Sequence, residues 1–372
     1  MKEVNGHEII TLFENWSPKR YALDGDPVGV HIGQLNRPVK TVLTTLDVNE
    51  DVIDEAIEKG ATLIIAHHPP IFRPLKGVAT DTPQGRVIEK CLKNDITVYA
   101  AHTNLDVAPG GVNDMIAEQL GLMETKVVAP TYSESLYKIT VFSPVTHAAE
   151  MRLALKNAGA GTMGDYGGCS FTSSGTGRFT PIDGANPFIG EVGNEEVFNE
   201  EKIEVIIPQS LKSKVVKTML KMHPYEEPAY DVLMLDQRTA ELGLGRVGIL
   251  KEKMTLAQFA EHVKIAFNVP AVRVVGNPTT EIKKVAVLGG DGNKYIYDAK
   301  RSGADVFVTG DLYYHVAHDA EALGLSVVDP GHNIEKVMIK GVADYMRKAC
   351  EDKKFAVTFI ESEINTEPFQ FI

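Results

Sequence analysis

The chain has 372 residues, of which 44% are hydrophobic and 24% charged, and its formal net charge is −12 at pH 7. This length favours two structural units. The negative charge argues against a general nucleic-acid-binding surface. No apolar run reaches the roughly 18 to 20 residues that a membrane span needs. The start, MKEVNGHEIITLFENWSP, lacks the apolar stretch of a secretory signal, so we expect a cytoplasmic protein.

The first third of the chain alternates strand and helix patterns. Asn49 can cap the first of these helices and Gly121 can end the last. Continuous apolar strands separated by helices are typical of a parallel sheet that is covered on both faces. The predicted strands are 41–48, 61–68 and 96–106, the last running into a loop, and the predicted helices are 49–60, 84–94 and 111–120.

The pattern changes between about residues 132 and 237. Strand, helix, a long Gly-, Ser- and Thr-rich stretch, strand, helix and strand follow one another, which predicts an inserted α+β domain of ferredoxin-like type. Its segment HPYEEPAYD (223–231) holds one histidine and three acids. Pro224 and Pro228 favour a rigid structural connection there over a second metal site.

The strand and helix alternation returns near the C-terminus, with strands at 285–290, 304–311, 325–332 and 355–362. EKGATLIIAHH and RSGADVFVTGD can be laid over each other, so that Gly60-Ala61 matches Gly303-Ala304. This match predicts an internal duplication. We therefore expect an α/β fold, a duplicated α/β core with mostly parallel sheets interrupted by the inserted domain. The expected boundaries are 1–130 and 239–372 for the two halves of the core and 131–238 for the insert.

Two adjacent histidines, His67 and His68, end the second predicted strand. Neutral imidazole is a common metal ligand, but adjacent side chains on a strand point to opposite faces. The two rings can therefore converge only if the backbone leaves the strand, and Pro69 and Pro70 would stiffen that exit. Taken alone, the pair fits a buried hydrogen-bonded motif as well as a metal site.

Other potential ligands stand at further strand ends, where α/β folds place functional groups. Asp106 follows the third strand, and if a helix begins after Gly331, then His332 and Glu335 share a face of its first turn. Asp106 alone could be a loop or capping residue. Together, the five side chains suit two divalent ions that share a carboxylate, either Asp106 or Glu335.

Three further features of the sequence carry weaker signals. His102 and Asn104 are candidates for orienting the ligands from behind. His315, on the helix predicted after Asp311, is the candidate catalytic residue as a proton shuttle, although a helix-surface or core histidine fits equally well. LGGDGN (288–293) could cradle a phosphate, but it lacks the full phosphate-binding spacing, and a tight turn is favoured.

The motifs AHHPPIF, AAHTNLD, DPGHNIEK, DPVGVHIG and HPYEEPAYD resemble those of the Nif-three-like family, often labelled GTP cyclohydrolase 1 type 2. The resemblance covers nearly the whole chain and is strongest with the longer bacterial members that carry an insert similar to PII or CutA proteins. Pro27 and His31 stand where Asn and Gln are common in the family, which bears on substrate contacts. The resemblance implies a toroidal homohexamer with its sites facing an internal cavity, and a dinuclear metal site made by His67, His68, Asp106, His332 and Glu335.

Two functions compete. The first is a metal-dependent hydrolase in which a metal-bound hydroxide attacks a purine-ring carbon or a phosphoester, with GTP as the substrate that the family implies. The second is a non-enzymatic metal-binding or regulatory protein whose insert senses a ligand or gates the cavity. Three widely spaced cysteines form no zinc motif, so the expected cofactor is two divalent ions on nitrogen and oxygen ligands. Zinc is the first expectation, and iron, manganese or nickel are alternatives.

Overall fold

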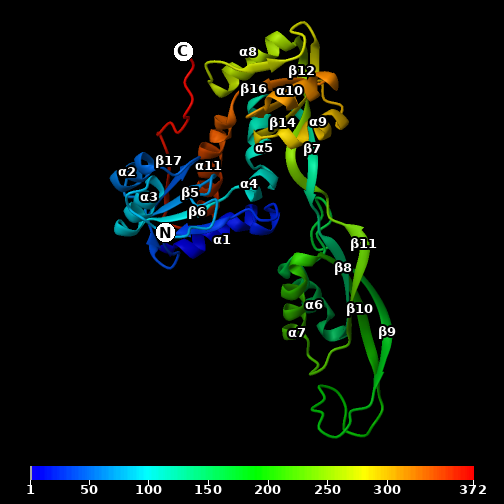
Figure 1. Cartoon of the computed structure of the whole chain (residues 1–372). Helices are drawn as coiled ribbons and strands as arrows, with labels where there is room; N and C mark the ends of the chain where they lie inside the picture. Colours follow the sequence, from blue (N-terminus) through cyan, green and yellow to red (C-terminus); the bar gives the residue numbers. More distant parts are fainter. Residues whose placement is uncertain (1) are drawn as a thin grey trace. The chain divides into compact units, whose positions relative to one another are not determined.

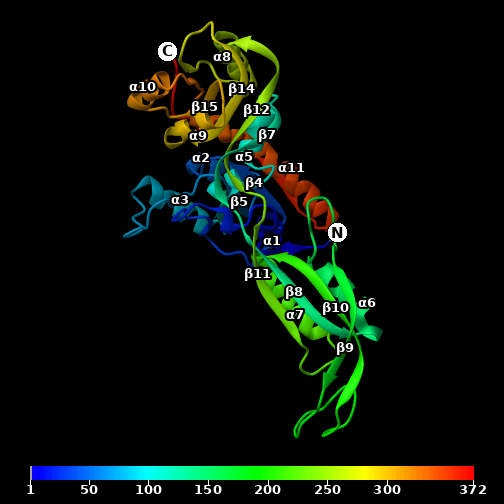
Figure 2. The same cartoon turned by 90° about the vertical axis from the view of Figure 1, so that its right-hand side faces the viewer.

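The computed structural model describes residues 2–372 and divides into two compact units. The core unit comprises the chain up to Tyr132 together with Glu241–Ile372, and the inserted unit comprises Ser133–Ala240. Both are mixed α/β structures (Figures 1 and 2). None of the helices in residues 2–372 is long and apolar enough to cross a bilayer.

The first sheet of the core unit is mostly parallel, as the sequence predicts. Its strand order is β17-β4-β5-β6-β2, and only β2 runs antiparallel to its neighbour. Asn49 caps the first connecting helix by accepting a hydrogen bond from the backbone of Val52. The strands are β2 (Gly29–Ile32), β4 (Thr41–Thr45), β5 (Leu63–Ala66), β6 (Thr97–Ala100) and β17 (Thr358–Glu361), and the connecting helices are α2 (Glu50–Glu58) and α3 (Pro83–Lys93).

The second sheet is mixed, and here the expectation of a mostly parallel sheet is wrong. Only the β16–β15 and β15–β14 pairs are parallel, whereas the three other pairs are antiparallel. The antiparallel strand β7 was not predicted because it is largely exposed and lacks a continuous apolar run. In spatial order the strands are β13 (Arg273–Val275), β16 (Ser326–Asp329), β15 (Val306–Gly310), β14 (Glu281–Asp291), β12 (Leu242–Thr255) and β7 (Met123–Tyr132).

The two halves of the core unit exchange strands and share one apolar core. β7 precedes the inserted unit but pairs with β12, which follows it. β17, the last strand in the described residues, pairs with β4 in the first sheet. One cluster of fully buried side chains joins both halves and includes Ile9, Ile116, Phe259 and Met338. The halves are therefore held as one body.

Helices and short elements complete the core unit. The long helices near the shared core are α1 (Gly6–Trp16), α5 (Val112–Gln119), α8 (Leu256–Phe267) and α11 (Val337–Asp352). The shorter elements are β1 (Val4–Asn5), η1 (Lys19–Tyr21), β3 (Pro38–Val39), α4 (Thr103–Val107), η3 (Asn293–Tyr295), α9 (Ile296–Arg301), α10 (Tyr314–Ala322) and η4 (His332–Lys336). Asp106 thus lies on the short helix α4, where the sequence predicts a loop.

The inserted unit is a four-stranded antiparallel sheet with two helices. Along the chain the elements are β8 (Ser135–Pro144), α6 (Val145–Ala158), β9 (Phe171–Phe179), β10 (Glu196–Pro208), η2 (Gln209–Leu211), α7 (Lys212–Met222) and β11 (Tyr230–Arg238). The strand order is β11-β8-β10-β9, and β9 forms from the Gly-, Ser- and Thr-rich stretch. His223 donates from Nε2 to the Phe142 carbonyl and accepts from the Tyr225 amide at Nδ1. Both ring nitrogens are therefore used structurally.

A buried ion pair ties α5 to β12. Arg246 is 5% exposed and donates from Nε and Nη2 to the two carboxylate oxygens of Asp114, over 2.5 and 2.7 Å. Its Nη1 donates to the carbonyls of Gly243 and Gly245. The guanidinium is thus satisfied only while Asp114 is present.

We expect Asp114→Ala to lower the free energy of unfolding by about 3–5 kcal/mol, because it leaves the Arg246 charge buried without a partner. The matched control is Glu281→Ala, which removes the exposed carboxylate paired with Lys253 and should cost less than about 1 kcal/mol. Denaturant unfolding of both full-length variants measures the difference. Equal losses would show that the Arg246 pair does not hold the core unit together.

Candidate metal centre

His67 and His68 lie where the chain leaves β5. The strand ends at Ala66 and the backbone bends over the next two residues. The bend turns both rings toward the same place, and their centroids lie 5.1 Å apart at 44°. The backbone therefore leaves the strand at His67, as it must if the His67 and His68 rings are to converge.

The His67 ring is fully buried and has one nitrogen without a hydrogen-bond partner. Nδ1 donates to the Ala101 carbonyl over 2.8 Å, so Nε2 is the nitrogen that faces the other ligands. Nε2 lies 3.7 Å from Asp106 Oδ1 and 3.7 Å from Glu335 Oε2. Among the described residues, neither Nε2 nor Asp106 Oδ1 makes a hydrogen bond, although both are buried. Buried polar atoms of this kind require a partner that the protein itself does not supply.

The rings of His68 and His332 are held in the same manner by two carboxylates. His68 Nδ1 donates to Asp47 Oδ1 over 2.7 Å, and His332 Nδ1 donates to Asp311 Oδ2 over 2.7 Å. The Nε2 atom of each ring lies 3.1 Å from Glu335 Oε2. Nδ1 thus fixes the orientation of each ring, and Nε2 is directed at the buried Glu335 carboxylate.

Three groups of side chains have ligand atoms that all lie within 4.8 Å of one another and could hold a metal ion. Two of these groups share Glu335, and the third brings in His102. The groups are His67, Asp106 and Glu335; His68, His332 and Glu335; and His67, His68 and His102. The structure therefore brings together all five residues that the sequence singles out as ligands.

The charges of the cluster shift several pKa values in the metal-free protein. Burial alone would lower the pKa of His68 and of His332, but the surrounding carboxylates raise them, to about 10 and about 9. Burial raises the pKa of Asp106 to about 6. Burial would also raise the pKa of Glu335, but the nearby histidines, His67 first, hold it well below its usual range. Without metal, His68 and His332 are therefore protonated at neutral pH.

The other candidates from the sequence lie in different places. His102 donates from Nδ1 to Asp26 over 2.7 Å, and its ring centroid is 5.3 Å from that of His67. Asn104 is buried and donates to Ser17, so it anchors α4 and not a ligand ring. His315 is exposed on α10 against Tyr314 and belongs to none of the three groups in the described chain.

Sequence reasoning missed the residues that orient the rings. Asp47 and Asp311 each follow a strand, β4 and β15, so the rule that located the ligands at strand ends could have found them. Asn113 has no comparable signal. Its amide donates to the Asp106 carbonyl and accepts from the Gly289 amide, which ties α4 to β14.

Gly289 and Gly290 leave room for the cluster, which explains the Gly-rich motif. A Cβ on Gly290 would lie 2.8 Å from Glu335 Oε1 and 3.2 Å from His332 Nε2, and the residue has a φ of +67°. The Gly289 and Gly292 amides already donate to Asn113 and Thr309. These hydrogen bonds leave those two amides unavailable to a phosphate. The predicted tight turn is shorter than the motif, because residues 288–291 still belong to β14 and η3 begins at Asn293.

The chain is similar to known sequences and solved structures over nearly its whole length. The family model Duf34/NIF3 (NGG1p interacting factor 3) matches residues 4–368. A GTP cyclohydrolase 1 type 2 homolog of Bacillus subtilis (strain 168) is 59% identical over 371 residues, covering 100% of both chains. The crystal structure of a Bacillus cereus protein related to NIF3 superposes with a TM-score of 0.95 at 57% identity, and Staphylococcus aureus protein SA1388 with 0.80 at 34%, each covering 100% of both chains.

We expect Gly290→Ala to weaken metal binding by about tenfold or more, because the methyl group would displace Glu335 and strain the backbone. Gly324→Ala is the matched control, since Gly324 has a φ of +63° and only the Lys300 Nζ atom, 3.9 Å away, near its Cβ position. Calorimetric titration of chelator-treated protein with Zn²⁺ measures both. If both variants bind alike, the Gly290 contact does not shape the site.

Metal binding at pH 7 should release protons, because rings such as His68 and His332 must give up their Nε2 protons to act as ligands. The sign follows from their raised pKa values: each ring is protonated below about 10 or about 9 and neutral above. Apparent affinity should therefore increase with pH over this range. Titrations in two buffers of different ionisation enthalpy count the protons, and identical heats in both would contradict the expectation.

Proposed function

The chain belongs to the Duf34/NIF3 family, and from this premise we propose that it binds two divalent metal ions and hydrolyses a nucleotide or another phosphate-bearing small molecule. One observation carries the proposal. A single buried carboxylate oxygen, Glu335 Oε2, lies within 3.1 to 3.7 Å of Nε2 atoms from three histidines. The name GTP cyclohydrolase 1 type 2 homolog, which the relatives carry, supports the choice of reaction class.

The side chains present fit divalent ions. Asp106 Oδ1 and His67 Nε2 are buried without partners, and the Nδ1 atoms of the ligand histidines are already occupied, as is usual for metal-binding histidines. We propose that His67, Asp106 and Glu335 hold one ion, that His68 and His332 hold the other, and that Glu335 is shared. Zinc is our first choice for both positions.

Two ions bring four positive charges, and two carboxylates cancel only two, so the open positions favour an anion or a carbonyl oxygen. When bound, such a pair lowers the pKa of water and stabilises the oxygens of a hydrolytic transition state. The protein's own contribution is orientation. Asp47 and Asp311 hold the rings of His68 and His332 from behind, so that little reorganisation is needed during reaction.

We propose His102, in place of His315, as the residue that moves a proton. Its ring lies 5.3 Å from the His67 ring and 5.8 Å from the His68 ring, and Asp26 fixes its Nδ1. Nε2 is then the nitrogen that can exchange a proton at the cluster. His315 lies outside the cluster.

The inserted unit and the assembly belong to the same proposal. Its order of elements, with the strands arranged β11-β8-β10-β9, supports a ferredoxin-like domain of PII or CutA type. The internal duplication stays a prediction, because the match of Gly60-Ala61 with Gly303-Ala304 places His68 opposite Asp311, which orients a ligand ring but is not itself a proposed ligand. The homohexamer and the cytoplasmic location stay predictions.

We expect His68→Ala and Asp106→Asn each to lower the metal content by about one ion per chain and to lower turnover by roughly 100-fold or more. The matched control is His7→Ala, which removes an exposed histidine on α1. Elemental analysis of protein purified without chelator gives the metal content. Turnover is measured against nucleotides and phosphoesters with added Zn²⁺, Mn²⁺ or Fe²⁺.

Two outcomes would contradict parts of the proposal. Unchanged turnover in metal-depleted protein would refute metal-dependent hydrolysis. Metal binding that depends on His68 and Asp106, but without turnover of any compound in the panel, would instead support the non-enzymatic regulatory alternative.

A further inference from the structure

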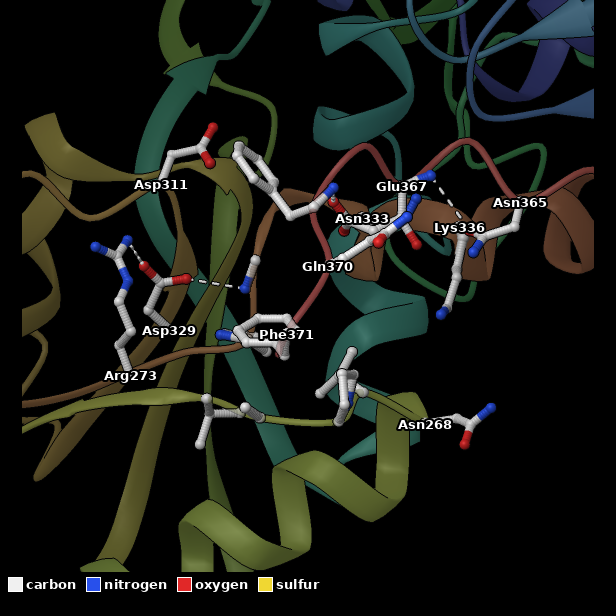
Figure 3. Close-up of a pocket in the computed structure, with 17 residues that line it drawn as sticks. Asn268, Arg273, Asp311, Asp329, Asn333, Lys336, Asn365, Glu367, Gln370 and Phe371 are labelled. Atoms are coloured by element: carbon white, nitrogen blue, oxygen red, sulfur yellow. Dashed lines mark hydrogen bonds and ion pairs between the residues drawn. The ribbon is translucent and has the colours of Figure 1, made fainter.

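A cavity of about 730 Å³ lies beside the metal centre in the core unit (Figure 3). Its volume is within the range of small-molecule sites, roughly 300–1,000 Å³. A second cavity of about 440 Å³ shares Asn268, Asn333, Lys336 and Asn365 with it, so the two adjoin. The space exceeds what metal ions and water need, and none of the five proposed metal ligands lines it.

The cavity reaches the metal centre through Asp311 and Gly331, which both line it. Asp311 accepts the hydrogen bond from His332 Nδ1, and Gly331 directly precedes His332. A molecule in the cavity would therefore lie one carboxylate away from a ligand ring. Asp311 bonds to Nδ1, whereas Nε2 is the atom that faces Glu335. The Asp311 carboxylate and the His332 ring therefore separate the cavity from the proposed metal positions.

The geometry of η4 explains why ligands and cavity are neighbours. In a 3₁₀ helix, side chains three residues apart eclipse one another. His332 and Glu335 therefore share one face, directed at the cluster, and Asn333 and Lys336 share the next face, which lines the cavity. Within residues 2–372, the structure records neither an ion pair for the Lys336 ammonium nor a hydrogen bond for the Asn333 amide. The Lys336 ammonium and the Asn333 amide are thus without partners in the cavity. Of the other charged groups in the lining, Arg273 pairs with Asp329, Asp311 accepts from His332, and Glu367 accepts from the Phe369 amide.

The other wall is the C-terminal segment 362–371, here called the strap. Ser362 and the Glu363 amide donate to Glu55, and Thr366 donates to Asp47 Oδ2 over 2.5 Å. Beyond this anchor, the Glu367 carboxylate accepts from the Phe369 amide, and the rings of Phe369 and Phe371 line the cavity. Figure 3 shows Phe371 beside Asp329 and Lys336 on the opposite side.

We propose that this cavity is a binding site, separate from the metal centre, for a small molecule that carries a phosphate and a flat ring, with the phosphate at Lys336 and the ring against Phe371. An ammonium group without a partner favours a phosphate or similar anion, and exposed phenylalanine rings favour a planar ring. The amides of Asn268, Asn333, Asn365 and Gln370 can read the polar edge of such a ring.

The test uses the full-length protein with phenyl phosphate as the probe, and with inorganic phosphate and phenol as its separate parts. Binding is measured by calorimetry with and without a chelator, so that binding in the cavity is separated from binding to metal. We expect phenyl phosphate to bind in the presence of chelator and more tightly than either part. Lys336→Met should weaken it by about tenfold or more, and Phe371→Ala by roughly threefold to tenfold.

The matched control is Lys348→Met, the same substitution at an exposed position of α11 outside both cavities, and it should leave binding unchanged. Absence of phenyl phosphate binding, or equal binding by wild type and Lys336→Met, would overturn the proposal. Binding that disappears with chelator would place the phosphate on the metals, which overturns the cavity assignment but not the metal centre.

Discussion

A negative charge buried among imidazoles is the constraint on which the rest of the core unit depends. Glu335 is 3% exposed, and an isolated carboxylate at such a depth would be costly. It is tolerated because Nε2 atoms from both halves of the core surround it. The hydrogen bond that each ring makes through Nδ1 fixes the direction of its Nε2. The partners of these hydrogen bonds follow β4, β6 and β15, so the ends of these strands must also be held in place.

The two halves of the core unit hold the ligands in position because they pack against each other. Helix α11 begins directly after the turn that bears Glu335 and packs in the same apolar cluster as α1 and α5. Asn113 connects the backbone near Asp106 to β14. Because these contacts cross between the halves, the ligands contributed by one half cannot shift without disturbing the packing of the other.

The sequence allows prediction of residues whose type is unusual at the end of a strand. It does not allow prediction of residues and strands whose role depends on which partner they contact in the folded protein. His67 and His68 are conspicuous because two adjacent imidazoles at the end of an apolar strand are potential metal ligands, and Asp106, His332 and Glu335 at other strand ends strengthen that interpretation. Asp47 and Asp311 contact the ligand rings directly, but a single aspartate after a strand is common. β7 was not anticipated because a half-exposed strand lacks a continuous apolar run. The position of β17 beside β4 reflects tertiary burial, which local patterns do not encode.

The exchange of β17 also has a consequence for biosynthesis. Thr41 in β4 has its parallel partner at Thr358, far along the chain. Until residue 358 has been synthesised, β4 presents an unpaired edge, and such edges are where chains associate wrongly. The slowest step of folding is therefore expected to be the pairing of these two segments, which are widely separated in sequence.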